Sequence, residues 1–443
     1  MESADEAPCE GQTKFLPFAS QLKTVNMHTT GEPTTIVYAG LPDLPLSMNT
    51  VHDRRDYLIE HHDDLRKALM QEPRGHSGSY GAYVLPVSPS DPRPRNDRPD
   101  IQVIFICASG KGYTPMCGHA TFALGRFLID WPFLFQDSQA PDGLPHPSTY
   151  HFDSAANTFV IRLETPCGTL PVHVAAISST SPSTSSRPVS FLSVPSHAIP
   201  DISIHAHDPG ARGLHRLLTS SAKTHDRVLA GFFESTHDQT YWRDVTVDLG
   251  YGGAWYLLVD MQKKPLDTVL YNDTSQRTDM LRYMSNLFLG WGRQYLKDLI
   301  RATEGGRDGE LYGVVLRSRL GKEREDELKR ECGVQDAEIG WCVFSDQQVD
   351  CSPTGGAVAA RVAVEVAKGT MKVGGSKAFQ SIVGEKMGSK GAFIGTAVEE
   401  CTVEGGSGTG AVRIRVAGRA FYTGLGEVVV EKDDALGTNG FVI

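Results

Sequence analysis

Several features that mark other classes of protein are missing from this chain of 443 residues. No run approaches the roughly 20 consecutive apolar residues that a membrane-spanning helix needs, so we expect no membrane association. The N-terminal segment MESADEAPCEGQTKF is acidic and has no apolar core, which argues against a secretory signal. The glycine pairs belong to no phosphate-binding or dinucleotide-binding fingerprint, so nothing implies a phosphate-containing cofactor. These absences predict a cytoplasmic protein.

Charge and cysteine content exclude further classes. The chain carries 43 Lys and Arg against 53 Asp and Glu, a formal net charge of −10, and such a surface repels the phosphates of nucleic acids. The eight cysteines are scattered without a CxxC pair, which fits neither a disulfide framework nor a zinc site. His205 and His207 could bind a metal ion together, but the sequence offers no third ligand. We therefore expect a small-molecule partner, no nucleic acid and no metal.

The length and the predicted elements indicate two domains of the α+β class. Because a domain usually has about 100–200 residues, this chain is too long for a single domain with one core. Apolar and β-branched residues predict a buried strand over 101–107, and amphipathic spacing predicts a helix over 53–70. The apolar segment 116–130 predicts a further helix, which Pro132 is expected to end. Strands dominate and helices do not alternate with them regularly, which favours α+β over a doubly wound sheet.

Three segments have the composition of tails or loops. Residues 1–20 are predicted to form a disordered tail. The Pro, Gly, Asp and Ser residues of 137–148 and the Ser, Thr and Pro residues of 178–186 predict two insertions, the second of them a flexible excursion at the surface.

A weak internal repeat relates two helix starts. The segment CGHATFA at 117–123 aligns with TGGAVAA at 354–360, and each copy follows a proline and opens an apolar helix. Two similar half-proteins that face one another would explain the repeat. A chance match between two short Gly/Ala-rich helix starts would explain it equally well.

The first helix start places the thiol of Cys117 where the helix dipole favours its ionised form. The positive end of a helix dipole at Cys117 is expected to lower the thiol pKa below its ordinary value of about 8.5. A thiolate there could act as a nucleophile or a base, and the free N–H groups that follow it could hold a carboxylate. One alternative is a purely structural role, in which Cys117 is a buried cysteine at the start of a core helix. A protease-like dyad with His119 is the other, although such dyads usually take their histidine from elsewhere in the fold.

At the second helix start a hydroxyl stands in the equivalent position. The glycines after Thr354 again leave backbone N–H groups free. A threonine hydroxyl is not appreciably ionised at neutral pH, so Thr354 can orient a substrate or a water but is a poor base. The Gly-Gly pair in DLGYGGAWY at 248–256 predicts either a close backbone approach beside a substrate or an ordinary strand turn.

Taken together, these segments resemble the proline racemase-like family over roughly residues 22–430. The turns MCGH and SPTG, at this separation, are the most specific features. The matching segments are MHTTGEP (27–33), EPRGH (72–76), MCGHATFALGRFLID (116–130), DLGYGGAWY (248–256), SDQQVDCSPTGGAVAARVAVEVAKG (345–369) and GRAFYTG (418–424).

The resemblance implies a fold and an assembly. Two pseudo-symmetric halves, each a barrel-like and mostly antiparallel sheet around a central helix, would enclose the substrate between them, as in the diaminopimelate epimerase-like fold. Residues 21–197 with 408–443 would form the N-terminal half that carries Cys117. Residues 198–407 would form the C-terminal half that carries Thr354. A homodimer is the assembly that we expect.

The resemblance also implies an activity without a cofactor. Racemases of the family use two cysteines, one at each helix start, and this chain has Thr354 at the second position, as in trans-3-hydroxy-L-proline dehydratases. Cys117 would take the α-proton, and loss of the 3-hydroxyl would give Δ1-pyrroline-2-carboxylate. Thr354 would position the substrate or a water. The substrate-binding groups would be the N–H groups of Gly118, His119, Gly355 and Gly356 at the carboxylate, with Asp350 and His119 at the ring nitrogen or hydroxyl.

One departure from the family keeps other functions open. Cys351 stands where most members have arginine. As a substitute second base it would make the protein a hydroxyproline 2-epimerase or a proline racemase. A non-catalytic relative that only binds cyclic amino acids is the alternative from another class, although such a protein has no need of the Cys117 thiol.

Overall fold

The computed structural model describes residues 20–442, except 46, 95, 110–111, 136–142, 177–186, 209–244, 263–273, 304–308, 345–347, 403–409 and 432. The predicted tail and the serine-rich insertion, apart from residue 20, lie outside these described residues, as does part of the insertion at 137–148. Among the described residues, no helix is both long and apolar enough to cross a membrane.

Strands make up most of the regular structure in the described part of the chain. They are β1 (Ser20–Thr29), β2 (Glu32–Ala39), β3 (Tyr80–Leu85), β4 (Ile101–Cys107), β5 (Tyr113–Thr114), β6 (His151–Asp153), β7 (Thr158–Thr165), β8 (Gly168–Ala175), β9 (Pro188–Leu192), β10 (His197–Ser203), β11 (Thr246–Tyr251), β12 (Trp255–Asp260), β13 (Leu311–Ser318), β14 (Asp336–Phe344), β15 (Gln348–Val349), β16 (Ser376–Ser381), β17 (Phe393–Cys401), β18 (Ala411–Arg419) and β19 (Phe421–Val430).

The helices of the described residues are fewer and are set between groups of strands. They are α1 (Val51–Met70), α2 (Gly118–Leu134), α3 (Ile204–His207), α6 (Thr274–Tyr295), α7 (Lys297–Thr303), α8 (Lys322–Cys332), α9 (Gly355–Ala367) and α10 (Ala435–Asn439), with the 3-10 helices η2 (Pro147–Thr149) and η6 (Gly384–Gly391). This mixed sheet with segregated helices confirms the α+β prediction.

The strands form one hydrogen-bonded network with a repeated pairing order. The first series runs β19–β1–β2–β3–β4–β7–β8–β9, and its pairs are antiparallel except β2–β3 and β4–β7. The second runs β10–β11–β12–β13–β14–β16–β17–β18, and its pairs are antiparallel except β12–β13 and β14–β16. The parallel pairs therefore fall at the same steps of both series. An antiparallel pairing of β9 with β18 joins the two series.

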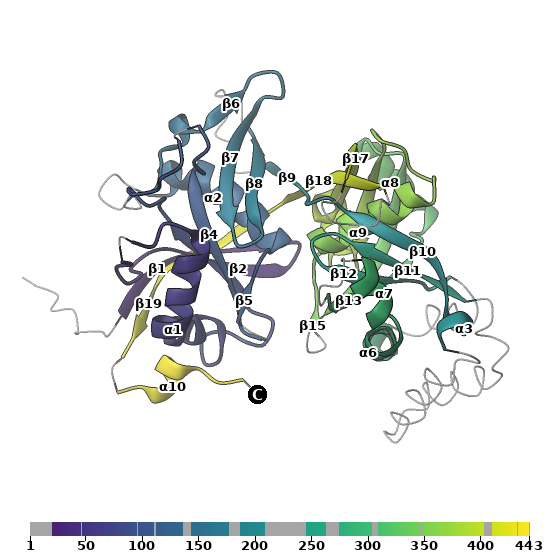
Figure 1. Ribbon diagram of the computed structural model, residues 1–443, viewed down its shortest axis with the longest axis horizontal. Helices are drawn as coiled ribbons and strands as arrows, with labels where there is room; N and C mark the ends of the chain where they lie inside the picture. Colours follow the sequence, from purple (N-terminus) through teal and green to yellow (C-terminus); the bar gives the residue numbers. More distant parts are fainter. Residues whose placement is uncertain are drawn as a thin grey trace, which may run out of the picture.

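Figure 1 shows these strands arranged in two lobes. One lobe holds α1, α2 and most of the first series, and the other holds α6 to α9 and most of the second. The strands β9 and β18 run across the region between the lobes. Helix α2 contacts β1, β2, β8 and β9, whereas α9 contacts β10, β11, β17 and β18. Each of these two helices is therefore covered mainly by strands of its own series.

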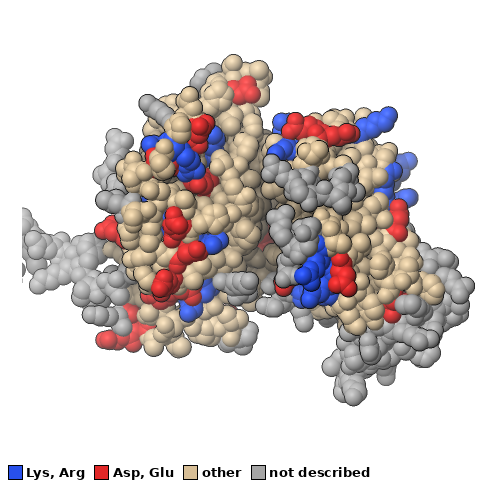
Figure 2. Space-filling view, in the orientation of Figure 1, with Lys and Arg blue, Asp and Glu red and all other residues tan. Residues whose placement is uncertain are grey.

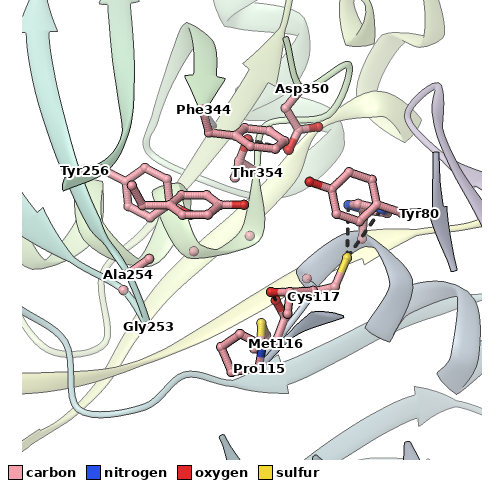
Figure 3. A pocket seen from close by; sticks show the side chains of 17 residues that line it. Tyr80, Pro115, Met116, Cys117, Gly253, Ala254, Tyr256, Phe344, Asp350 and Thr354 are labelled. Atoms are coloured by element: carbon pink, nitrogen blue, oxygen red, sulfur yellow. Dashed lines mark hydrogen bonds between the residues drawn. The ribbon is translucent and has the colours of Figure 1, made fainter. Parts of the chain in front are cut away.

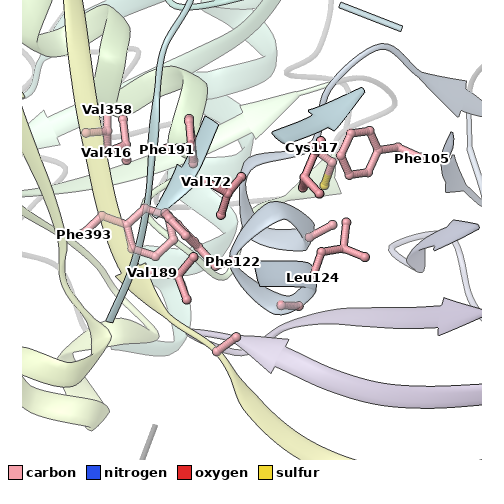
Figure 4. Packing of buried hydrophobic residues seen from close by; sticks show 14 of the residues in the cluster. Phe105, Cys117, Phe122, Leu124, Val172, Val189, Phe191, Val358, Phe393 and Val416 are labelled. Atoms are coloured by element: carbon pink, nitrogen blue, oxygen red, sulfur yellow. The ribbon is translucent and has the colours of Figure 1, made fainter. Parts of the chain in front are cut away.

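Both helices belong to one apolar core. Phe122 of α2 packs edge-on against Phe393 of β17, with ring centroids 4.9 Å apart, and lies 5.3 Å from the ring of Phe191 of β9 (Figure 4). All three side chains are fully or almost fully buried. Burying a phenylalanine contributes about 1.5–3 kcal/mol relative to leaving it exposed. This contact between strands of both lobes and α2 holds the helix starts in place.

Local sequence explains where α1 begins, but not where α2 ends. Thr50 and Asp53 form a capping box at the start of α1, so the helix predicted over 53–70 begins at Val51. Pro132 was expected to end the second helix, yet α2 continues to Leu134. This prediction was wrong because a proline in the last turn removes only one hydrogen bond, close to the end where the helix stops anyway.

Candidate active site

A pocket between the two lobes brings together all of the residues that the sequence singled out as a site. Figure 2 shows a hollow there whose visible walls are mostly uncharged. The described residues that line the pocket are Tyr80, Thr114, Pro115, Met116, Cys117, Gly118, His119, Gly252, Gly253, Ala254, Tyr256, Tyr312, Phe344, Asp350, Thr354, Gly355 and Gly356.

The start of α2 carries the only cysteine among the residues that line this pocket. Cys117 is the N-cap residue, with an extended backbone, and its carbonyl accepts the first helical bond from Thr121 at 3.0 Å. The N–H groups just before that bond have no partner within the helix, which is the general property of a helix start. Figure 3 places Cys117 on one side of the pocket, across from Asp350 and Thr354.

The start of α9 places a hydroxyl on the opposite side of the pocket. Thr354 has φ 60° and ψ 106°, a strained conformation for a β-branched residue. Its hydroxyl donates a 2.7 Å hydrogen bond to Oδ2 of Asp350, and its backbone N–H donates to Oγ of Ser352 at 3.2 Å. The surrounding turn therefore fixes the direction of the hydroxyl.

The two helix starts meet at a pair of glycines. A Cβ added to Gly118 would lie 3.1 Å from Cα of Gly355, and one added to Gly355 would lie 3.3 Å from Cα of Gly118. A Cβ on Gly252 would lie 2.1 Å from the carbonyl oxygen of Gly356, so the predicted close approach of the Gly-Gly pair is confirmed. Two helix N-termini that converge on one pocket concentrate N–H donors and positive dipole ends, which suits a carboxylate.

This close approach gives a prediction for Gly355→Ala. The new methyl group would press against Gly118 and against the ring of Phe191, whose nearest atom would lie only 3.1 Å away. We expect the helix starts to separate and the affinity for a carboxylate ligand to fall by about tenfold or more, the loss of roughly one charge-assisted hydrogen bond. The affinity for pyrrole-2-carboxylate, a planar cyclic carboxylate, measured by calorimetry, tests this prediction. Gly424→Ala is the control, because nothing lies within 4 Å of its added Cβ.

Burial, and not the helix dipole, has the larger effect on the pKa of the Cys117 thiol. Cys117 is buried in the apolar core beside Phe105 (Figure 4). Burial raises the pKa of the thiol well above its ordinary value, the negative charges of Asp350 and Glu32 add to this, and only the N–H of Ala120 opposes it. The lowered pKa expected from the sequence is therefore wrong for the free protein, because loss of water outweighs the helix start.

His119 does not supply a charged partner for the thiol. Sγ of Cys117 lies 3.4 Å from Nε2 and 3.5 Å from Nδ1 of His119. Burial lowers the pKa of His119 to about 4, against the charge of Asp350 and a hydrogen bond to the carbonyl of Pro33. The imidazole is therefore neutral at neutral pH. A thiolate–imidazolium pair of the protease type does not form, so the dyad alternative is disfavoured.

Four aromatic side chains form a wall of the pocket that the sequence did not reveal. The rings of Tyr312 and Phe344 are stacked with centroids 5.3 Å apart, Tyr256 meets Tyr312 edge-on at 5.6 Å, and Tyr80 meets His119 edge-on at 5.0 Å. Burial raises the pKa of each tyrosine, so their hydroxyls remain hydrogen-bond donors. Only Tyr256, within DLGYGGAWY, lay in a segment that could have signalled this wall.

Other candidates from the sequence do not line the pocket. Cys351 is not among the described lining residues, and its backbone N–H donates to Oε2 of Glu32 at 2.9 Å. His205 and His207 lie in the short helix α3 and are not among the described residues that line the pocket. Among the described residues, no group of three or more His, Cys, Asp or Glu side chains is placed to hold a metal ion.

Comparison with known proteins now identifies the family. A family model described as proline racemase matches residues 24–211 and 324–442. The chain belongs to the proline racemase family. One relative is a trans-L-3-hydroxyproline dehydratase of Mus musculus, which is 32% identical, with 96% of each chain covered. Another is a 3-hydroxyproline 2-epimerase of Burkholderia multivorans, which is 28% identical, with 97% of this chain and 100% of the other covered.

A solved structure shares the fold of this family member. It is a hydroxyproline epimerase from Agrobacterium vitis with bound trans-4-OH-L-proline. The TM-score is 0.61 at 21% identity, and 96% of each chain is covered. The likeness therefore extends over both lobes of the proline racemase family member.

Proposed function

We propose that this chain is a cofactor-independent hydro-lyase that converts trans-3-hydroxy-L-proline to Δ1-pyrroline-2-carboxylate. The observation that carries the proposal is the unequal pair of helix starts, with a thiol at Cys117 and a hydroxyl at Thr354 on opposite sides of one pocket. A two-base inversion needs an acid or base on each face of the substrate, whereas an elimination on one face needs only one. The dehydratase relative at 32% identity supports the same function.

The stereochemistry of the substrate matches a single base. In the trans isomer the 3-hydroxyl and the α-hydrogen both lie on the ring face opposite the carboxylate. Cys117 as a thiolate takes the α-proton, the bond from C3 to oxygen breaks, and a double bond forms between Cα and C3. The thiol then gives its proton to the departing hydroxyl, so that water leaves. The enamine becomes the imine by moving a proton from nitrogen to C3.

Backbone groups at the two helix starts stabilise this reaction. N–H groups of Gly118, His119, Gly355 and Gly356 hold the substrate carboxylate, where negative charge accumulates as the α-proton leaves. Asp350 accepts a hydrogen bond from the hydroxyl of Thr354 and faces the substrate ring nitrogen together with His119. Thr354 positions the substrate or a water.

The raised pKa of Cys117 requires that the thiolate form only with substrate bound. A zwitterionic cyclic amino acid brings a ring ammonium group into the pocket close to the thiol. This positive charge stabilises the thiolate and lowers the thiol pKa, because an opposite charge within about 4–6 Å favours the ionised form. The thiol therefore stays protonated in the empty pocket, which protects it from reactions with other electrophiles.

The repeated pairing order supports two equivalent halves in this proposal. Each series has parallel pairs at its third and fifth steps, and each surrounds one helix that begins at the pocket. The predicted boundaries were 21–197 with 408–443, and 198–407. Because β18 continues the second series and β19 begins the first, we place the return to the N-terminal half after β18. A cytoplasmic homodimer remains part of the proposal, and light scattering of the purified protein measures the assembly.

The proposal is tested by incubating the protein with trans-3-hydroxy-L-proline and, for comparison, with cis-3-hydroxy-L-proline, L-proline and trans-4-hydroxy-L-proline. Each reaction is followed by proton NMR in D2O. We expect Δ1-pyrroline-2-carboxylate from the trans isomer and none from cis-3-hydroxy-L-proline, whose hydroxyl lies on the face away from the thiol. L-Proline has no leaving group, so we expect its α-hydrogen to exchange with deuterium without inversion.

Other outcomes would assign a different function. Inversion at Cα of L-proline, trans-3-hydroxy-L-proline or trans-4-hydroxy-L-proline would make the protein an epimerase, as in the Burkholderia multivorans relative. In that case Thr354, bonded to the Asp350 carboxylate, is the group placed to serve the second face. Binding without product, exchange or inversion would leave a protein that only binds cyclic amino acids.

A further inference from the structure

Two buried carboxyl groups meet at the edge of the pocket. Glu32, at the start of β2, is 4% exposed, and Asp350, just after β15, is 6% exposed. They come from different lobes, yet Oε2 of Glu32 accepts the backbone N–H of Cys351, the residue that directly follows Asp350, at 2.9 Å, and the charge of Asp350 acts on Glu32. Only Asp350 lines the pocket. The proposed mechanism gives Glu32 no role.

Neutral donors occupy most of the oxygens of this carboxyl pair. Oδ1 of Asp350 accepts the N–H of Ser352 at 2.7 Å, and Oδ2 accepts the hydroxyl of Thr354 at 2.7 Å. Oε2 of Glu32 accepts the N–H of Cys351 at 2.9 Å. These bonds satisfy lone pairs but add no positive charge.

The groups around the carboxyl pair do not compensate two negative charges. The titratable described groups that interact with Glu32 or Asp350 are Cys117 and His119 of α2, Tyr80 of β3, Tyr256 of β12, Tyr312 of β13, Cys342 of β14 and Cys351 in the turn before α9. On the neighbouring strand β1, His28 accepts the N–H of Gly31 at 3.1 Å through Nδ1, and burial lowers its pKa. His119 is neutral at neutral pH because burial lowers its pKa to about 4. The buried cation of α9, Arg361, binds Glu338 at 3.1 Å and the carbonyl of Pro353 at 2.7 Å instead.

We propose that Glu32 is a proton-holding residue, so that the Glu32 and Asp350 carboxyl groups together carry one proton and one negative charge. Two ionised carboxylates that are both buried at the same turn would repel each other strongly without a cation between them. A shared proton relieves the repulsion and adds a hydrogen bond.

The charge of the pair affects how well the pocket binds a cyclic amino acid. This role of Glu32 therefore rests on the proposed function. A cyclic amino acid brings a carboxylate and a ring ammonium into the same pocket. One negative charge at Asp350 attracts the ammonium group of the substrate. Two negative charges on the pair would also weaken binding of the substrate carboxylate. Burial and then the charge of Asp350 raise the pKa of Glu32 well above its ordinary value, and the N–H of Cys351 opposes them. Glu32 thus acts as a positioning residue, through Asp350.

The sign of the pH dependence follows from this charge state. The pair loses its proton as the pH rises through its upper pKa, and the second negative charge then repels an anionic ligand. Pyrrole-2-carboxylate is such a ligand, because its ring nitrogen carries no charge. We expect its affinity to fall by up to about tenfold per pH unit above that pKa, the slope for uptake of one proton on binding.

The first test is infrared difference spectroscopy of the free full-length protein, comparing wild type with Glu32→Gln. We expect the carbonyl stretch of a protonated carboxylic acid at neutral pH, a shift of this band in D2O, and its loss in Glu32→Gln. Glu164→Gln is the matched control, because buried Glu164 is bound by both terminal nitrogens of Arg93, at 2.8 and 2.9 Å. Absence of the band in wild type, or its persistence in Glu32→Gln, overturns the proposal.

The second test follows the affinity for pyrrole-2-carboxylate against pH in proteins that also carry Cys117→Ser, so that the thiol does not titrate. We expect the fall in affinity with Glu32 present and a flat profile with Glu32→Gln; equal profiles refute the role of Glu32. The infrared band is measured without turnover. A protein that shows the band but does not dehydrate trans-3-hydroxy-L-proline would therefore refute the proposed reaction while leaving the shared proton in place.

Discussion

With Cys117 replaced by serine, turnover of trans-3-hydroxy-L-proline is expected to fall by about 10²–10⁴-fold, the contribution of a positioned acid–base group. Serine is almost the same size as cysteine, so the packing around the start of α2 should change little. Its hydroxyl, however, does not ionise in the pH range where even a buried thiol can be activated by a bound cation. Initial rates of product formation measure the effect.

Cys167→Ser is the matched control for this prediction. Cys167 is a half-buried free cysteine in the turn between β7 and β8, outside the pocket. We expect its replacement to leave the rate unchanged. If Cys117→Ser and Cys167→Ser proteins turned over equally fast, the proton transfer would have to be reassigned. Unchanged affinity of Cys117→Ser for pyrrole-2-carboxylate would show that the site itself is intact.

The largest expected effect on stability comes from Arg361→Met. Arg361 is 1% exposed, binds Glu338 at 3.1 Å and donates to the carbonyl of Pro353 at 2.7 Å. Removing one partner of a buried ion pair costs about 3–5 kcal/mol, because the other charge is left uncompensated. Lys377 lies 3.1 Å from Glu338 and remains. We therefore expect the lower end, about 3 kcal/mol, in urea unfolding.

The control for Arg361 is an arginine at the surface. Arg415 of β18 is exposed, and Arg415→Met should change the free energy of unfolding by no more than about 0.5 kcal/mol. Similar losses in the two variants would mean that the buried cation contributes nothing beyond its side-chain packing. Because Arg361 also holds the turn before Thr354, its replacement should lower the affinity for pyrrole-2-carboxylate, whereas Arg415→Met should not.

The sequence was most informative where one short segment carries both the fold and the chemistry. Proline, then a reactive side chain, then glycine and an apolar run predicted the helix starts at Cys117 and Thr354, and the structure brings both to one pocket. Asp350 was expected at the site only because of the resemblance to the family. The two helix starts could be found because the local chain alone determines their geometry.

The remaining features depend on contacts between distant segments. Glu32 and Asp350 are far apart in the chain, and nothing in either segment reveals that they meet. Tyr80 reaches the pocket only because β3 lies beside β4 and the start of α2. The thiol pKa depends on how completely the lobes bury Cys117, a quantity that helix position cannot give.

The meeting of Gly118 and Gly355 has an evolutionary consequence if the two halves are equivalent. A half-length ancestor that dimerised about a twofold axis would have brought the same residue of each copy into contact with itself, as isologous interfaces do. Only a residue without a side chain fits such a contact at this distance. After fusion of the two copies, the residue before each glycine was free to diverge. In this chain the residue before one glycine is Cys117, with a thiol, and the residue before the other is Thr354, with a hydroxyl, so the two helix starts present different side chains to one pocket.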